Sequence, residues 1–199
     1  MISTHLHRVL ATGILAGACL AAPTAHAADY AFSGHIRFHN DLVQIDFALA
    51  APASVQLWTD SWLGGLNVDP QLSLWRDGLR VAANDDDDTV ASGQGYYDAG
   101  LSLHLADGHY RLVLSAAGND PVGASLAQGF SLGTEAPIAL TDWTQPSSDI
   151  NAGDQKGGFW QLHLSGVSQA AAVPEPASYA LLAAGLMTVL WLARRRPGH

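Results

Sequence analysis

Cysteine is almost missing from this sequence. The chain of 199 residues has a single cysteine, Cys19, which lies in an N-terminal segment that we expect to be removed. A lipoprotein signal would place Leu three residues before it, where Ala16 stands, so lipidation is only a minor alternative. The remainder has no thiol, which excludes disulfide bonds, thiolate zinc sites and cysteine nucleophiles.

Basic residues are also scarce. Between residues 28 and 172, five Lys and Arg face seventeen acidic residues, for a net charge of −12, compared with −9 for the whole chain. This balance argues against nucleic acid or anionic lipid as a partner. Sixteen of the seventeen acids are Asp, a residue that suits turns, loops and calcium sites better than helices.

Motifs for catalysis are missing too. The chain has no Gly-x-Ser-x-Gly, His-Glu-x-x-His or P-loop pattern. His35 and His39 are four residues apart on an expected strand, where that spacing amounts to about 13 Å, so they are not expected to share a zinc ion. Glycoside hydrolysis needs two carboxylates, but a chain this rich in Asp always offers such a pair, so its presence does not indicate a glycosidase. We therefore expect a protein that is not an enzyme.

Residues 28–165 show no sustained helical period, and strand patterns fill them instead. In residues 42–49, Val43, Ile45, Phe47 and Leu49 alternate with more polar positions, which is the pattern of a half-buried strand. Similar patterns cover residues 30–39, 54–59 and 159–164. Residues 128–132 and 137–143 are possible strands, and the small residues 166–172 are expected to form a linker.

Two pairs of strand patterns are joined by Asp-Gly. Asp77-Gly78 and Asp107-Gly108 predict hairpins with type I′ turns, in which both central residues have positive φ. Many short strands with regular turn signals predict an all-β fold, an antiparallel β-sandwich formed as one domain by residues 28–165.

Part of this region resembles the pre-peptidase C-terminal (PPC-like) domain family. The similarity rests on IDFAL at 45–49, DPQLSLW at 69–75, NDD at 84–86 and GHY at 108–110. It implies a jelly-roll-like sandwich of the kind found in secreted proteins, where such domains are accessory rather than catalytic. It covers about half of residues 28–165 and ends before residue 120.

Targeting patterns flank this region. Residues 1–27 combine a weakly basic start, an apolar run and the small-x-small site Ala25-His26-Ala27, which predicts a signal peptide cut by signal peptidase. Residues 173–199 begin with Val173, followed by Pro174-Glu175-Pro176. An uncharged stretch, 177–193, is followed by a basic tail of three arginines. As a helix, 177–193 spans about 25 Å, slightly less than a ~30 Å hydrocarbon core, and the basic tail would stay in the cytoplasm.

The C-terminal order resembles the PEP-CTERM sorting signal of Gram-negative bacteria. In that family an exosortase recognises the signal and cleaves near Pro-Glu-Pro, so the resemblance implies a chain that is a membrane intermediate first and then a surface or matrix protein. An ordinary anchor that is never cut is the alternative. The residues expected to carry sorting are Pro174, Glu175, Pro176, Arg194, Arg195 and Arg196.

The acidic run at 85–88 is a candidate metal site. Calcium takes about six to eight oxygens, which sandwich loops supply from Asp side chains and carbonyls. The candidate ligands of one calcium ion are Asp69, Asp85, Asp86, Asp87 and Asp98. A solvated acidic loop is the alternative.

Trp58, Trp62 and Trp75 are candidates for carbohydrate binding. Trp58 and Trp75 are expected on the face opposite their strands' aliphatic residues, and Trp62 in a Gly-containing loop. The alternative is that the rings pack in a core, because a one-residue slip in register exchanges the two faces. The sequence thus predicts an exported structural or adhesive sandwich, with a module that binds exopolysaccharide as the alternative.

Overall fold

The computed structural model describes residues 27–143, 157–174 and 185–189. Among the predicted segments, residues 1–26 of the signal peptide lie outside the described residues. So do most of residues 177–193 and the basic tail. Within the described part, none of the helices reaches the length and apolar character of a membrane span.

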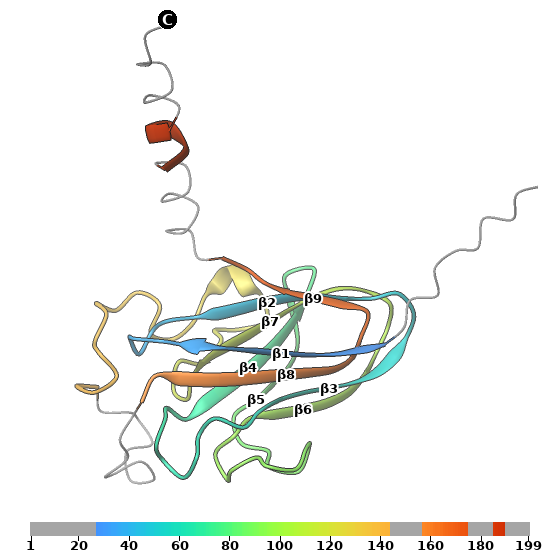
Figure 1. Cartoon of the computed structure of the whole chain (residues 1–199), viewed down its shortest axis with the longest axis horizontal. Helices are drawn as coiled ribbons and strands as arrows, with labels where there is room; N and C mark the ends of the chain where they lie inside the picture. The colour runs from blue at the N-terminus through green and yellow to red at the C-terminus, as the bar shows by residue number, and fades with distance from the viewer. Residues whose placement is uncertain (1–26, 144–156, 175–184, 190–199) are drawn as a thin grey trace, which may run out of the picture.

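Nine strands and one 3₁₀ turn make up the fold between residues 28 and 172, which confirms the all-β prediction, and residues 185–189 are helical (Figure 1). The elements are β1 (Ala28–His35), β2 (Val43–Leu49), β3 (Ala53–Thr59), β4 (Pro70–Arg76), β5 (Leu79–Asn84), β6 (Gly100–Leu105), β7 (Gly108–Ala116), η1 (Leu126–Gln128), β8 (Phe159–Val167) and β9 (Gln169–Ala172).

The strands form two antiparallel sheets. One sheet has the order β1-β8-β3-β6, and the other has the order β5-β4-β7-β2-β9. Among the first eight strands, only β4 and β5 are consecutive strands of the same sheet, and the order is that of two interleaved Greek keys, which is the jelly-roll arrangement. β9 adds one strand to the edge of the second sheet beside β2.

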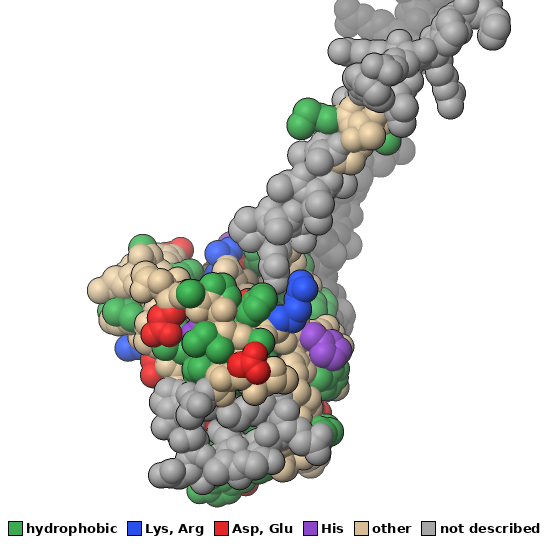
Figure 2. All heavy atoms as spheres, turned by 90° about the vertical axis from the view of Figure 1, so that its left-hand side faces the viewer, with side chains coloured by type: hydrophobic (Ala, Val, Ile, Leu, Met, Phe, Trp, Pro, Cys, Tyr) green, Lys and Arg blue, Asp and Glu red, His purple; other side chains and the backbone are tan. Residues whose placement is uncertain are grey.

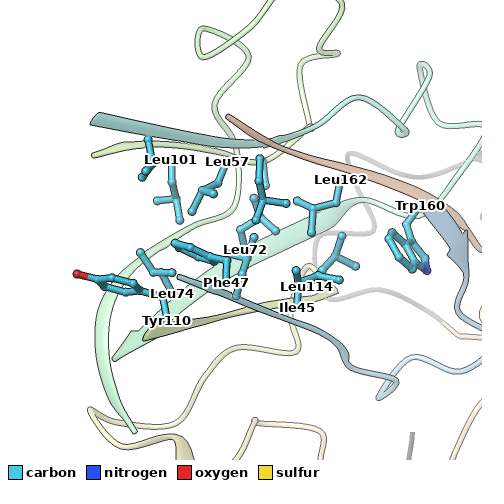
Figure 3. Packing of buried hydrophobic residues seen from close by; sticks show 14 of the residues in the cluster. Ile45, Phe47, Leu57, Leu72, Leu74, Leu101, Tyr110, Leu114, Trp160 and Leu162 are labelled. Carbon is cyan, nitrogen blue, oxygen red and sulfur yellow. The ribbon is translucent and has the colours of Figure 1, made fainter. Parts of the chain in front are cut away.

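Alternating side chains from both sheets meet in one core (Figure 3). Ile45 and Phe47 of β2 are almost completely buried, as the alternation in 42–49 predicts. Across from them lie Leu57 of β3 and Leu162 of β8, both with no exposed surface. Burial of apolar surface in this layer stabilises the sandwich by about 25 cal/mol for each Å² that is removed from water.

The two Asp-Gly hairpins differ. Asp77 and Gly78 have φ of +51° and +76°, so the β4–β5 turn has the positive φ at both positions that a type I′ turn requires. In the β6–β7 connection only Gly108 has a positive φ, so the prediction of a second type I′ turn is wrong. There Arg76 donates a 3.0 Å hydrogen bond to the carbonyl of Asp107, which holds the turn from the neighbouring hairpin.

The possible strands at 128–132 and 137–143 do not form. The chain instead makes η1 and two isolated bridges, Pro121 to Phe130 and Phe38 to Ala139. In Figure 2, this end of the sandwich shows hydrophobic side chains interspersed with acidic and polar ones. Such a mixture is typical of an ordinary exposed surface.

The prediction of a linker at 166–172 is wrong. Residues up to Val167 belong to β8, and Gln169–Ala172 form β9, which pairs with β2 from Ala48 to Ile45. Small residues fit this edge because Ala170 packs against the core. The sandwich therefore continues to the start of the Pro-Glu-Pro segment.

Candidate functional site

Three aspartates meet where β4 begins and β5 ends. Asp69 directly precedes β4, and Asp85 and Asp86 directly follow β5. Because these strands are antiparallel, with Leu72 opposite Asn84, the start of one lies beside the end of the other. One carboxylate oxygen from each of the three aspartates lies within 4.8 Å of the others. Asp69 is buried, whereas the other two are exposed.

A third strand brings further polar groups to the same place. β7 pairs with the other side of β4, with Pro70 opposite Ala116, so the loop after β7 lies near the start of β4. Asp120 in this loop accepts a 3.0 Å hydrogen bond from Nε2 of Gln71. Neither residue could be predicted from the sequence, because no local pattern links positions 49 residues apart.

The charges of this cluster act on one another. The pKa of Asp85 is raised from its ordinary value of 3.8 to about 6, first because neighbouring atoms keep water away from part of its carboxyl group and second because of the negative charges of Asp86 and Asp120. Burial also raises the pKa of Asp86. Within the described residues, no ion pair includes Asp85 or Asp86. Ionisation of these aspartates is therefore unfavourable unless a cation binds to the cluster.

Asp98, another predicted ligand, serves the fold instead. It has no exposed surface, and its Oδ1 accepts hydrogen bonds from the Thr59 hydroxyl at 2.8 Å and from the backbone N–H groups of Ser61 and Trp62. Its Oδ2 accepts a 2.7 Å hydrogen bond from the N–H of Gly95. Both oxygens thus hold the loops after β3 and before β6.

Asp87 is also occupied within its own loop. Its Oδ1 accepts hydrogen bonds from the backbone N–H and the hydroxyl of Thr89, at 3.0 and 2.6 Å. These two hydrogen bonds form a local turn at the end of the acidic run. Of the five predicted ligands, the structure brings together Asp69, Asp85 and Asp86.

The three tryptophans lie in different environments. Trp75 is 1% exposed, packs edge-on against Phe130 and donates a hydrogen bond to Ser73. It is on the predicted outer face, but the loop that carries Phe130 covers that face, so the prediction that Trp75 binds sugar is wrong. Trp62 is partly buried and meets the ring of Tyr97 at 4.9 Å in an edge-on contact.

Trp58 lies on the outer face of the β1-β8-β3-β6 sheet. Its indole stacks on the imidazole of His163, with ring centroids 5.0 Å apart and the planes 12° from parallel. Nε2 of His163 is 3.0 Å from Oδ2 of Asp60 and 3.2 Å from Nε2 of Gln161. The register pairs Trp58 with His163, an arrangement that sequence alternation alone does not reveal.

The rest of this face is polar and carries few charges. Ser33 lies opposite Gln161, Gln56 opposite Ser165, and Ser54 opposite His104. The four strands contain no Lys or Arg, and their only acidic residue is Asp29. Hydroxyl, amide and imidazole groups around one flat aromatic stack can offer both hydrogen bonds and a stacking surface.

The sorting residues begin where the sandwich ends. Val173 donates a 2.8 Å backbone hydrogen bond to the carbonyl of Gln44 in β2, so the chain is held to the sheet through this residue. Pro174 is the next residue and is described. The remaining predicted sorting residues lie outside the described residues: Glu175, Pro176, Arg194, Arg195 and Arg196.

Comparison with known proteins identifies this last segment. A family model described as the PEP-CTERM protein-sorting motif matches residues 172–196. A search of curated proteins found no match. The matched segment begins at the last residue of β9 and includes all the residues predicted to carry sorting. The chain therefore carries a PEP-CTERM sorting motif directly after its β-sandwich, and the motif implies export, surface sorting and processing by an exosortase.

Proposed function

We propose that the mature protein is a structural or adhesive component of the bacterial cell envelope or extracellular matrix, and that the β-sandwich carries this role. The observation that carries this proposal is the PEP-CTERM motif at 172–196, attached to a single folded unit. In this route, signal peptidase removes residues 1–27. Residues 177–193 hold the chain in the membrane until an exosortase cuts near Pro174, Glu175 and Pro176.

The character of the sandwich supports a role without catalysis. Its core is continuous between the two sheets, and the resemblance to PPC-like domains points to an accessory module. The most conspicuous buried carboxylate outside the acidic cluster, Asp98, is engaged by four donors that organise loops. A stable, acidic body of this kind suits a component that is displayed outside the cell.

The processing route is tested by intact-mass measurement. The chain is expressed in a host with an exosortase and recovered from the cell surface and the medium. We expect both ends to be missing from the recovered protein. A triple variant, Pro174→Ala with Glu175→Ala and Pro176→Ala, is expected to keep its C-terminal end. Pro197→Ala, one residue beyond the matched segment, is the control and should be processed normally. Surface-recovered protein that retains Arg194 would contradict the proposal.

A second candidate function is binding of exopolysaccharide through the outer face of the β1-β8-β3-β6 sheet. Trp58 and His163 supply a stacked aromatic pair, and Asp60 and Gln161 lie within hydrogen-bond distance of that imidazole. Sugars present apolar ring faces edged by hydroxyl groups, so a stacking surface beside polar groups is the matching chemistry.

Polysaccharide pull-down separates the two functions. The full chain is incubated in detergent with matrix polysaccharide from the producing cells, and the bound fraction is measured. For a carbohydrate-binding module we expect binding that Trp58→Ala or His163→Ala reduces by at least about tenfold, since about 1.4 kcal/mol corresponds to tenfold in affinity. His109→Ala, on the outer face of the other sheet, is the matched control. No retention of the wild-type chain would rule out this second function.

A further inference from the structure

We propose that Asp69, Gln71, Asp85 and Asp86 bind one calcium ion at the end of the β5-β4-β7-β2-β9 sheet. The three carboxylates each place an oxygen within 4.8 Å of the other two. Oxygens on opposite sides of a calcium ion are about 5 Å apart, because each lies about 2.3–2.6 Å from the metal. The observed spacing therefore allows all three groups to reach the same ion.

Gln71 provides an independent indication of a ligand at this place. It is 5% exposed, and its Oε1 has no hydrogen-bond partner among the described residues. A buried acceptor without a partner loses its hydrogen bonds to water and gains none in return, so native structures rarely keep one unused. A cation beside this oxygen would satisfy it.

The strand register places Gln71 next to the cluster. Asp69 is two residues earlier in the chain, which puts both side chains on the same face of the sheet. The pairing of β4 with β5 ends at Leu72 and Asn84, and continuing this register by one step puts Asp85 opposite Gln71. The hydrogen bond from Nε2 of Gln71 to Asp120 fixes the amide at this end of the sheet.

The ligand atoms indicate calcium. All four are oxygens, which hard cations prefer, and the cluster contains no histidine. Three carboxylates that bind through one or two oxygens each, together with one amide oxygen, cover most of the about six to eight positions that calcium takes. Magnesium would need a stricter octahedron, and it usually retains more of its water.

The local charge also favours a cation. Three carboxylates whose oxygens lie within 4.8 Å of one another repel one another when they are ionised. A divalent ion reverses that effect, because each carboxylate then faces a positive charge. The ion would tie the start of β4 to the end of β5 and hold the acidic loop 85–98 against the sheet.

Calorimetric titration of the full chain in detergent, after treatment with a chelator, tests the site. We expect calcium to bind with a Kd of about 10⁻⁴–10⁻³ M, the range of extracellular calcium modules, and to raise the melting temperature reversibly. Asp85→Asn with Asp86→Asn should weaken binding by at least about tenfold, which removes most of the shift. Asp88→Asn removes the same kind of charge from the same loop and should change neither result.

Gln71→Met gives a second test that does not alter charge. It keeps the length of the side chain but removes the amide oxygen, so we expect calcium to bind several-fold more weakly. Absence of a heat signal up to about 10 mM calcium, tenfold above the weakest expected Kd, would overturn the proposal. Equal affinity in the wild type and in the double Asn variant would overturn it as well, because the ion would then bind elsewhere.

Discussion

The hydroxyl of Thr59 donates a 2.8 Å hydrogen bond to Oδ1 of Asp98, and both residues are completely buried. The same hydroxyl accepts a 3.0 Å hydrogen bond from the N–H of Ala99, so the pair joins the end of β3 to the segment before β6. A carboxylate with this many donors is a structural element of the sandwich. It is not available for an external ion without breaking those hydrogen bonds.

Replacement of Asp98 should therefore affect stability strongly. In Asp98→Asn an amide NH₂ group replaces one acceptor, so a donor faces a donor, and we expect a loss of about 2–4 kcal/mol in the free energy of unfolding. Urea denaturation of the full chain in detergent measures it. Asp88→Asn, an exposed change of the same chemistry, should stay within about 0.5 kcal/mol. Equal stability of the two variants would contradict this role of Asp98.

Trp75 and Trp58 should respond differently to truncation. Trp75 is buried against Phe130, so we expect Trp75→Ala to cost about 3–5 kcal/mol through the cavity that it leaves. Trp58 is partly exposed, and Trp58→Ala should cost only about 1–2 kcal/mol. Thermal unfolding of both variants measures the difference. A reversed order would show that the burial of the two rings is misassigned.

Gly166 should not tolerate a side chain. Its φ is +81°, and a Cβ atom there would lie 2.4 Å from the carbonyl oxygen of Ser54 in β3. We expect Gly166→Ala to destabilise the fold by about 2–4 kcal/mol, because backbone strain and a clash with the neighbouring strand add together. Gly78→Ala is the control. It has a similar φ of +76° but open space around the new Cβ, so strain alone should cost about 1–2 kcal/mol.

Asp85 should make stability depend on pH when calcium is removed. Its pKa is raised from 3.8 to about 6 in the folded protein, so the folded state binds its proton more tightly than the unfolded state does. The stabilisation is complete below about pH 4 and is lost as the pH rises through about 6. Melting curves in chelator at several pH values measure this contribution.

The matching variant for the pH series is Asp85→Asn. Its side-chain amide has no proton to release in this range, so the part of the slope between about pH 4 and 6 that Asp85 contributes should disappear, while Asp88→Asn should keep it. An identical slope in the wild type and in Asp85→Asn would refute the raised pKa.

Local alternation predicted the inner faces of the strands well. Positions such as Ile45, Phe47 and Leu162 are buried as expected, because period-two patterning depends only on neighbouring residues. The pattern also placed Trp75 on the face opposite Leu72 and Leu74. It did not reveal that a later loop covers this face, because that contact joins Trp75 to a residue 55 positions further along the chain.

The candidate sites were harder to predict for the same reason. Composition drew attention to the acidic run, but only the pairing of β4 with β5 and β7 distinguishes Asp85 and Asp86 from Asp87. Gln71 and His163 gave no local signal, because their neighbours come from distant strands. β9 was missed because its alanines have little strand preference alone, and pairing with β2 decides their conformation.

The hydrogen bond from Val173 to Gln44 holds the chain to the sheet up to the start of the Pro-Glu-Pro segment, so the connection that follows is short. Residues 174–176 alone separate that anchoring point from the expected membrane segment, and three extended residues reach only about 10–11 Å. In the proposed route, the sandwich would therefore rest against the lipid headgroups until it is cut. Cleavage would then release a sandwich with very few residues after β9. A component that retains the protein outside the cell would therefore have to bind the sandwich itself.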